Sequence, residues 1–285
     1  MKYLKIIFYA ALAMIAVVSC TQKSQKEEAP KGLIESKMLV LYYSQTSNTK
    51  TVAHEIATRL DADIEEIAMV EPYDTAFQTT IERCMADREK GILPEIKPLA
   101  SDLTKYDVIF LGYPVWFGTF APPVDAFLSQ VDLSGKKVVP FCTFGSGGLE
   151  SSIKDLAEKQ PNAEILSGYG VRAARLAAMP REVEQFLTVG GFIEGAYVQP
   201  EAFPEQHPVS ADEAAIFDAA VDGYPMLNAK ATTVSSRAIP EGIEYLFNAK
   251  DMPREDKPDM PPAGELMVYV TVEKDAKPVF TKVVR

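Results

Sequence analysis

The feature that most constrains the fold is a regular alternation of short apolar runs and amphipathic segments between residues 38 and 189. Met38 to Tyr43 is a continuous apolar and aromatic run, as expected for a parallel strand buried on both faces. In the next segment, Thr49 to Leu60, the apolar residues fall three and four positions apart, which is the spacing of one helix face. Repeated β-α units of this length predict an α/β fold: a doubly wound, five-stranded parallel sheet with right-handed crossovers and helices on both faces.

The remaining elements of this unit follow the same alternation. We predict strands at residues 63–67, 107–112, 137–143 and 164–167, and helices at residues 77–90, 122–131, 149–159 and 182–189. Pro140 lies inside a strand that should be central, where proline removes a hydrogen bond of the ladder. We keep that strand because its neighbours Val138, Val139 and Phe141 fit a buried strand.

After residue 195 the pattern changes to one predicted helix followed by four predicted strands, which indicates a small α+β unit. The helix is expected at residues 211–222 and the strands at 228–238, 243–249, 265–273 and 279–284, separated by clusters of Pro, Gly, Asp and Lys. The proline-rich stretch 252–262 is expected to be a long exposed loop. We therefore place one domain at residues 38–195 and a second at residues 196–285.

The N-terminal residues have the three-part layout of a secretory signal. Two lysines precede an apolar run at residues 6–18, which is too short for a comfortable membrane span. The sequence Val17-Val18-Ser19-Cys20 resembles a bacterial lipobox, which implies cleavage before Cys20 and lipidation of that cysteine; the alternative is a signal peptide with a coincidental cysteine. We expect a signal peptide at residues 1–19, a flexible tether at 20–37, and a protein exported and lipid-anchored to a bacterial membrane, on its periplasmic or surface face.

The charge and the cysteine count exclude several classes of partner. The formal net charge is −11, which disfavours nucleic acid as a partner. With two His, three Cys and no CxxC motif, a metal site of the common His/Cys type is not expected. Besides Cys20, the cysteines are Cys84 and Cys142. A disulfide between them stays open, but we expect two buried free thiols because Cys142 lies in a predicted central strand.

Three loops follow strands of the predicted parallel sheet, at the carboxyl ends where such sheets bind ligands. The first, residues 44–49, offers hydroxyls, an amide and backbone N–H groups at a helix N-terminus, which favours an anion. A plain N-cap is the alternative, since Ser, Thr and Asn are preferred at any helix start. Six consecutive polar residues without Gly or a carboxylate fit a phosphate better, and the absence of GxGxxG and P-loop patterns argues against a dinucleotide or a nucleoside triphosphate.

The second and third loops are rich in aromatic residues and in glycine. Residues 112–119 contain the only Trp of the chain, with Phe117 beside it, which indicates a flat ligand to stack upon or a loop that folds back over the core. Residues 143–148 contain three glycines, which permit close backbone approach to a ligand or form a simple flexible turn.

Together these loops resemble the flavodoxin family, in its bacterial branch with a long helix between the second and third strands. The resemblance covers the chain from Met38 to about Gly191. Residues 43–49 look like the phosphate loop of that family, residues 106–119 like its flavin-ring loop, and residues 137–143 with the glycine-rich tail like its third loop. The branch often carries Trp where Phe117 stands, and its third loop more often reads Ser-Gly-Gly after the Thr.

The resemblance implies a flavodoxin-like fold that binds FMN non-covalently, with the phosphate held without a salt bridge. The flavin ring would stack near Trp116, with Phe117 or Phe144 as its other contact. The implied cofactor-binding residues are Ser44, Gln45, Thr46, Ser47, Asn48, Thr49, Pro114, Val115, Trp116, Phe117, Gly118, Thr143, Phe144, Gly145, Gly147 and Gly148.

We therefore expect an FMN-dependent electron-transfer protein at an extracytoplasmic membrane surface, whose partner is a redox protein or a small quinone-like acceptor. The alternatives are an FMN-dependent quinone or nitro reductase that uses NAD(P)H, and a surface binding module that has lost its flavin. The C-terminal unit weakly resembles the cystatin fold, with residues 235–245 similar to its first hairpin. Because the glutamine of the inhibitory hairpin is absent and Pro240 intrudes, a structural or docking role is expected there.

Overall fold

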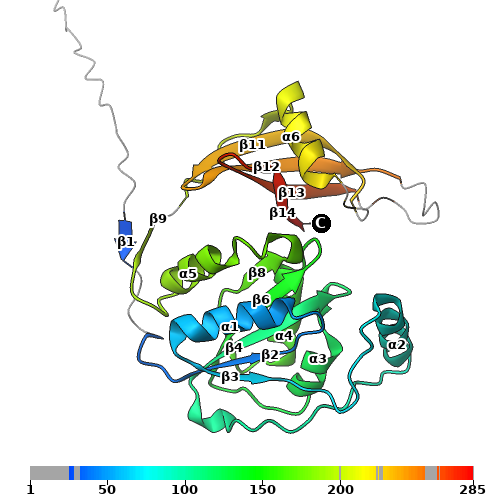
Figure 1. The fold of residues 1–285 in the computed structure, drawn as a ribbon, viewed down its shortest axis with the longest axis vertical. Helices are drawn as coiled ribbons and strands as arrows, with labels where there is room; N and C mark the ends of the chain where they lie inside the picture. The colour runs from blue at the N-terminus through cyan, green and yellow to red at the C-terminus, as the bar shows by residue number, and fades with distance from the viewer. Residues whose placement is uncertain are drawn as a thin grey trace, which may run out of the picture.

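The structure is a computed structural model that describes residues 26–28, 33–198, 200–222, 224, 227–253, 262 and 264–284. The predicted signal peptide, Cys20 and most of the predicted loop at 252–262 lie outside the described residues. No helix in the described ranges is long and apolar enough to cross a bilayer. Figure 1 shows two units, a mixed α/β unit and a smaller unit whose sheet carries one helix.

A parallel sheet forms the centre of the first unit. Its strands are β2 (Met38–Tyr42), β3 (Asp63–Glu66), β4 (Val108–Trp116), β6 (Lys137–Phe144) and β7 (Glu164–Ile165), hydrogen-bonded in the order β3-β2-β4-β6-β7. Strand β8 (Tyr169–Arg172) continues the fifth position, because it also pairs with β6 in parallel. This is the 2-1-3-4-5 order of flavodoxin-like sheets, so the predicted doubly wound parallel fold is confirmed.

Helices cover both faces of the sheet. Helices α1 (Asn48–Leu60) and α5 (Met179–Val189) lie on one face, and α3 (Pro122–Leu128) and α4 (Leu149–Lys159) on the other (Figure 1). Two short 3₁₀ turns, η2 (Leu103–Lys105) and η3 (Ala173–Arg175), complete the connections. Helix α2 (Phe77–Glu89) stands apart from both layers and buries only Thr80 and Cys84.

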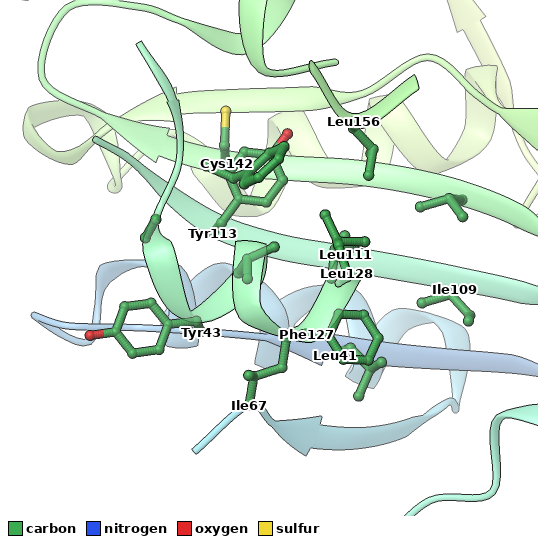
Figure 2. Packing of buried hydrophobic residues seen from close by; sticks show 14 of the residues in the cluster. Leu41, Tyr43, Ile67, Ile109, Leu111, Tyr113, Phe127, Leu128, Cys142 and Leu156 are labelled. Carbon is green, nitrogen blue, oxygen red and sulfur yellow. The ribbon is translucent and has the colours of Figure 1, made fainter. Parts of the chain in front are cut away.

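The core consists of two apolar layers, one on each face of the sheet. Successive strand residues point to opposite faces, so Leu39 and Leu41 pack in one layer while Val40 packs in the other. Figure 2 shows part of the first layer, where Leu41 and Leu111 meet Phe127 of α3. Each fully buried side chain of this size contributes about 1.5–3 kcal/mol through its burial. Cys84 and Cys142 are buried and free, as predicted.

Pro140 is accommodated in β6 by an interruption of the neighbouring strand. β6 pairs with β7 up to Val138, and its pairing with β8 begins at Phe141. The C=O of Val138 accepts from Leu166 N, so alternate residues of β6, including Pro140, turn toward this neighbour. The missing N–H of Pro140 therefore faces the break between β7 and β8, where no ladder bond is lost.

Several boundaries differ from the prediction. Strand β4 runs on to Trp116 and forms a hairpin with β5 (Thr119–Phe120), although the strand was predicted to end at residue 112 and residues 112–119 to form a loop. Helix α3 ends at Leu128, three residues before the predicted end. Part of the predicted flexible tether is ordered, because β1 (Lys26–Glu28) pairs with β9 (Ala196–Val198).

The second unit is one helix on an antiparallel sheet, as predicted. The helix is α6 (Ala211–Val221), and the sheet order is β10 (His207–Pro208), β11 (Ala229–Ile239), β12 (Gly242–Asp251), β13 (Glu265–Glu273) and β14 (Val279–Val284). A capping box of Ser210 and Glu213 starts α6. Phe217 of the helix packs edge-on against Phe247 of the sheet, 5.2 Å between ring centroids. The cystatin resemblance of this unit stays a prediction.

Candidate functional site

A cavity of about 360 Å³ opens at the carboxyl ends of β2, β4 and β6, within the size range of ligand sites. All three predicted loops contribute to its lining. The predicted residues that line it are Gln45, Thr46, Asn48, Pro114, Val115, Trp116, Phe117, Thr143, Phe144 and Gly145. The predicted residues that do not line it are Ser44, Ser47, Thr49, Gly118, Gly147 and Gly148.

The first loop leaves the N-terminus of α1 open. The N-cap residue Ser47 is left-handed, with φ 65° and ψ −4°, and its side chain makes no capping hydrogen bond. In the described part of the chain, the backbone N–H groups of residues 46–49 have no protein acceptor. Four donors at the positive end of a helix dipole form a site for an anion. A left-handed non-glycine residue costs free energy, and such strain is concentrated at functional sites.

Side chains of the same loop are held by neighbours and fix its shape. The Ser44 hydroxyl accepts from Lys50 N at 3.2 Å. Gln45 uses both ends of its amide: Oε1 accepts from the Tyr43 hydroxyl at 2.6 Å, and Nε2 donates to the Asp74 carbonyl at 2.7 Å. Ser44 and Gln45 therefore shape the loop with their side chains, and the open donors come from its backbone.

Thr49 has a structural partner. Its hydroxyl lies 2.8 Å from the Thr143 hydroxyl, with Thr49 1% and Thr143 4% exposed. This hydrogen bond joins the first turn of α1 to the end of β6. It fixes the first loop relative to the third from inside the protein.

The second loop is a tight hairpin that carries aromatic rings. Phe117 and Gly118 both have positive φ, 52° and 85°, and connect β4 to β5 as a two-residue turn of the primed type. The Phe117 ring is 50% exposed at the cavity rim. Trp116 lines the cavity and packs edge-on against Tyr43 and Tyr73, at 6.2 Å and 5.3 Å between ring centroids. The turn therefore presents both rings to the cavity, Trp116 packed among aromatic neighbours and Phe117 at the rim, where the Arg88 guanidinium lies 5.8 Å from its ring centroid.

The third loop divides into a cavity part and a packing part. Thr143, Phe144 and Gly145 reach the cavity, although the Phe144 ring is mostly buried beneath the loop against Gly170. Of the two predicted partners of Trp116, Phe117 is thus the accessible one. Gly147 instead faces strand β14, where an added Cβ would lie 2.5 Å from the carbonyl oxygen of Val283.

Helix α2 supplies a wall that the sequence did not reveal. Thr75, Phe77, Thr80, Ile81, Cys84 and, from another segment, Ala173 also line the cavity. Phe77 is 78% exposed, and Ile81 follows it by one helical turn. The sequence signal that could have indicated this wall is the apolar pair Phe77 and Ile81, four residues apart on a helix that buries little else.

The lining is uncharged. Among the described residues that line the cavity, none is Asp, Glu, Lys or Arg, although the whole chain carries a net charge of −11. Burial raises the pKa of the Cys84 thiol, so this lining cysteine stays protonated at neutral pH. The described residues contain no cluster of three or more His, Cys, Asp or Glu side chains that could hold a metal ion. The cavity can therefore offer neutral donors and aromatic surface.

Residues 37–178 match the model of the family described as flavodoxin. The chain carries a flavodoxin-family domain. The match runs from β2 to residue 178, just before α5, and contains all three loops of the cavity. The smaller C-terminal unit lies outside the matched range.

Solved structures resemble about half of the chain. A candidate flavoprotein from Bacteroides eggerthii is 27% identical, with a TM-score of 0.48, over 54% of this chain and 97% of that chain. A candidate flavoprotein from Bacteroides uniformis is 25% identical, with a TM-score of 0.44, over 52% of this chain and 98% of that one. A flavoprotein from Lactobacillus acidophilus, solved in complex with FMN, is 25% identical, with a TM-score of 0.44, over 47% and 93%.

Proposed function

We propose that the flavodoxin domain binds FMN non-covalently in this cavity and serves electron transfer at an extracytoplasmic membrane surface. One observation carries the proposal: a single uncharged cavity joins the open N-terminus of α1 to an aromatic wall. FMN has a phosphate at one end and a flat ring at the other, so its two ends require these two surfaces.

The phosphate end would be held by backbone donors. The N–H groups of residues 46–49 have no acceptor in the described part of the chain, and the side chains of Ser44 and Gln45 keep the loop in shape. Binding through neutral donors and a helix dipole needs no salt bridge. Asn48 and Thr46 line the same end of the cavity with an amide and a hydroxyl.

The ring end would be held by Trp116 and Phe117, with Phe77 and Ile81 on the side of α2. FMN, when bound, supplies one- and two-electron transfer, and the protein supplies binding and electrostatics. An uncharged cavity in a strongly acidic chain disfavours additional negative charge on its ligand. We therefore expect a low reduction potential for the bound cofactor.

The location at a membrane rests on the N-terminal sequence. The lipobox-like segment that ends at Cys20 supports export and lipid anchoring, and it lies outside the described residues. A redox protein or a small quinone-like molecule remains the expected electron acceptor. Labelling with a radioactive or alkyne-tagged fatty acid, compared between the wild type and Cys20→Ala, tests the anchor: label that persists in Cys20→Ala contradicts it.

Cofactor binding can be measured with a probe that is part of the chain. Trp116 is the only Trp and lines the cavity, so FMN bound there should quench most of the protein fluorescence at one FMN per chain. Riboflavin, which lacks the phosphate, should bind more weakly by at least about tenfold, because the donors at α1 lose their anion. Colourless protein whose fluorescence ignores added FMN would refute FMN binding and leave the flavin-free binding module. Stopped-flow reduction by NADPH then separates an electron carrier from an NAD(P)H-dependent reductase.

A further inference from the structure

We propose that the C-terminal unit holds the third loop, residues 143–148, in its flavin-binding arrangement through β14 and Arg172, so that FMN binding and docking of this unit are energetically coupled. The inference rests on the proposed FMN function. Figure 1 shows the chain end of β14 between the two units, beside the ends of β6 and β8.

Strand β14 approaches the loop as an added strand would. Val283 N donates to the Ser146 carbonyl at 2.7 Å. The Val283 carbonyl faces the same way, since an added Cβ on Gly147 would lie 2.5 Å from its oxygen. β14 is an edge strand of its sheet, so these outward-facing groups of Val283 are not used by β13. The absence of a side chain at Gly147 is therefore what lets the C-terminal unit come this close to the loop.

Arg172 connects the same loop to the same strand from inside the interface. The residue is 7% exposed. Its Nε donates to the Gly145 carbonyl at 2.7 Å and its Nη1 to the Phe280 carbonyl at 2.7 Å. The guanidinium also lies 3.3 Å from the ring centroid of Phe280 and 5.2 Å from that of Tyr224. One side chain thus bridges a residue that lines the cavity and two aromatic residues of the C-terminal unit.

Burial of the Arg172 cation costs free energy, which its neighbours must offset. In the described part of the chain it has no carboxylate partner within salt-bridge distance, and burial lowers its pKa to about 10. Buried charges are normally paired. Carbonyl oxygens and aromatic faces are the only compensation described for Arg172. Separation of the units would remove the contacts with Phe280 and Tyr224, and movement of the loop would remove the hydrogen bond to Gly145.

Further contacts between the units include ion pairs at the surface. Lys282 pairs with Glu150 at 2.9 Å, and Arg181 of α5 pairs with Glu241 at 3.1 Å and Glu273 at 2.9 Å. Exposed pairs contribute little, about 0–1 kcal/mol each. They can orient the C-terminal unit, whereas the contacts of Val283 and Arg172 act directly on the loop.

The coupling to FMN follows from preorganisation. Gly145 lines the cavity, and its carbonyl is fixed by Arg172. A loop that is already ordered loses less conformational freedom when a ligand binds, so affinity rises. By linkage, FMN must then strengthen the docking of the C-terminal unit by the same factor.

The test uses the full chain and two independent variants. Arg172→Gln keeps a hydrogen-bond donor. It removes the charge and the ability to donate to the Gly145 and Phe280 carbonyls at the same time. Val283→Pro removes the N–H that donates to Ser146 and also replaces a valine side chain that is buried in the C-terminal unit. Proline is tolerated in an edge strand where the N–H faces away from the sheet. We expect each variant to raise the FMN dissociation constant, read from Trp116 fluorescence, by about tenfold.

A second readout does not need the cofactor. Hydrogen exchange of the backbone amides of residues 144–150 should be faster in both variants than in the wild type without FMN, and FMN should slow exchange of residues 279–284 in the wild type. The control is Arg237→Gln. Like Arg172, Arg237 lies over an aromatic ring, that of Phe203 at 4.3 Å, and donates to a backbone carbonyl, that of Glu201; unlike Arg172, it pairs with a carboxylate, Glu244, and makes no described contact with the loop. It should leave FMN affinity and loop exchange at their wild-type values.

The outcomes are distinct. If the wild type binds no FMN, the proposed function and the coupling both fail. If the wild type binds FMN and both variants bind it equally well, the coupling alone is overturned, even where loop exchange is faster. If Arg237→Gln weakens FMN binding as much as Arg172→Gln, the effect is general destabilisation and the inference is also overturned. If circular dichroism shows that Arg172→Gln does not fold, the FMN affinity of Val283→Pro alone tests the coupling.

Discussion

The hydrogen bond between Thr49 and Thr143 gives a quantitative test of how the site is built. The two hydroxyls are 2.8 Å apart and both residues are buried. Thr49→Val or Thr143→Val keeps the side-chain shape and leaves the other hydroxyl buried without this partner. An unsatisfied buried polar group costs about 1–3 kcal/mol, so each single variant should lose stability in that range.

The double variant should differ from the sum of the singles. With both hydroxyls replaced by methyl groups, no unpaired group remains, and such a pair of changes can be nearly neutral. The second substitution should therefore restore about 1–3 kcal/mol of what the first removed, which appears as a large coupling energy in a double-mutant cycle.

Urea unfolding followed by Trp116 fluorescence measures the free energies, because Trp116 belongs to the flavodoxin domain and reports on that unit alone. Thr51→Val is the matched control: Thr51 lies on the same helix, is exposed, and donates to the Ser47 carbonyl at 3.0 Å. It should change stability by no more than about 0.5 kcal/mol. Additive losses in the double variant would show that the two hydroxyls do not depend on each other, and the account of how the first and third loops are joined would be wrong.

Three further predictions concern single groups of the flavodoxin domain. Trp116→Ala should weaken FMN binding by about 1–3 kcal/mol, measured by flavin fluorescence, and an unchanged affinity would remove Trp116 from the site. Tyr73→Phe should leave stability unchanged or raise it by up to about 1 kcal/mol in urea unfolding, because the buried Tyr73 hydroxyl has no hydrogen-bond partner within the described structure; a loss above that size would reveal a partner. Burial raises the pKa of Tyr42 and Tyr73 to about 12, so the folded state keeps protons that the unfolded state loses above about pH 10. Stability should therefore be fully present below pH 10 and fall between pH 10 and 12, and tyrosine absorbance at 295 nm should rise together with unfolding; early titration of these tyrosines in folded protein would contradict this.

The parallel sheet was predictable because its chemistry is local. Strands buried on both faces must be apolar throughout, so the apolar runs at Leu39–Leu41 and Val108–Leu111 predict such strands directly. Pro140 looked like a conflict because the sequence does not show that the neighbouring strand is interrupted beside it. The length of the fifth strand position was underestimated for the same reason, because β8 is recognised as its continuation only by its pairing with β6.

The site was predictable by position and only partly by residue. Loops after strands of a parallel sheet converge, so the three loops were found, but which of their atoms face the cavity depends on tertiary contacts. The hydroxyl of Thr49 points inward to Thr143, and Gly147 packs against Val283 of the C-terminal unit. A left-handed Phe117 is a rare conformation that composition does not predict. The wall of α2 was missed because an exposed Phe77 on a helix is also an ordinary surface residue.

The interface between the two units stabilises an exposed group on each side: the edge strand β14 and the third loop. β14 is the edge of an antiparallel sheet, and an uncovered edge exposes donors and acceptors that attract other strands. The third loop contains three glycines, and glycine loses more conformational freedom on ordering than any other residue. The hydrogen bond from Val283 to Ser146 covers part of the edge and orders the loop at the same time. Because β14 and the third loop are hydrogen-bonded, a shift of β14 must also shift the loop. A partner that binds the C-terminal sheet and moves β14 could therefore alter the affinity of the flavodoxin domain for its cofactor.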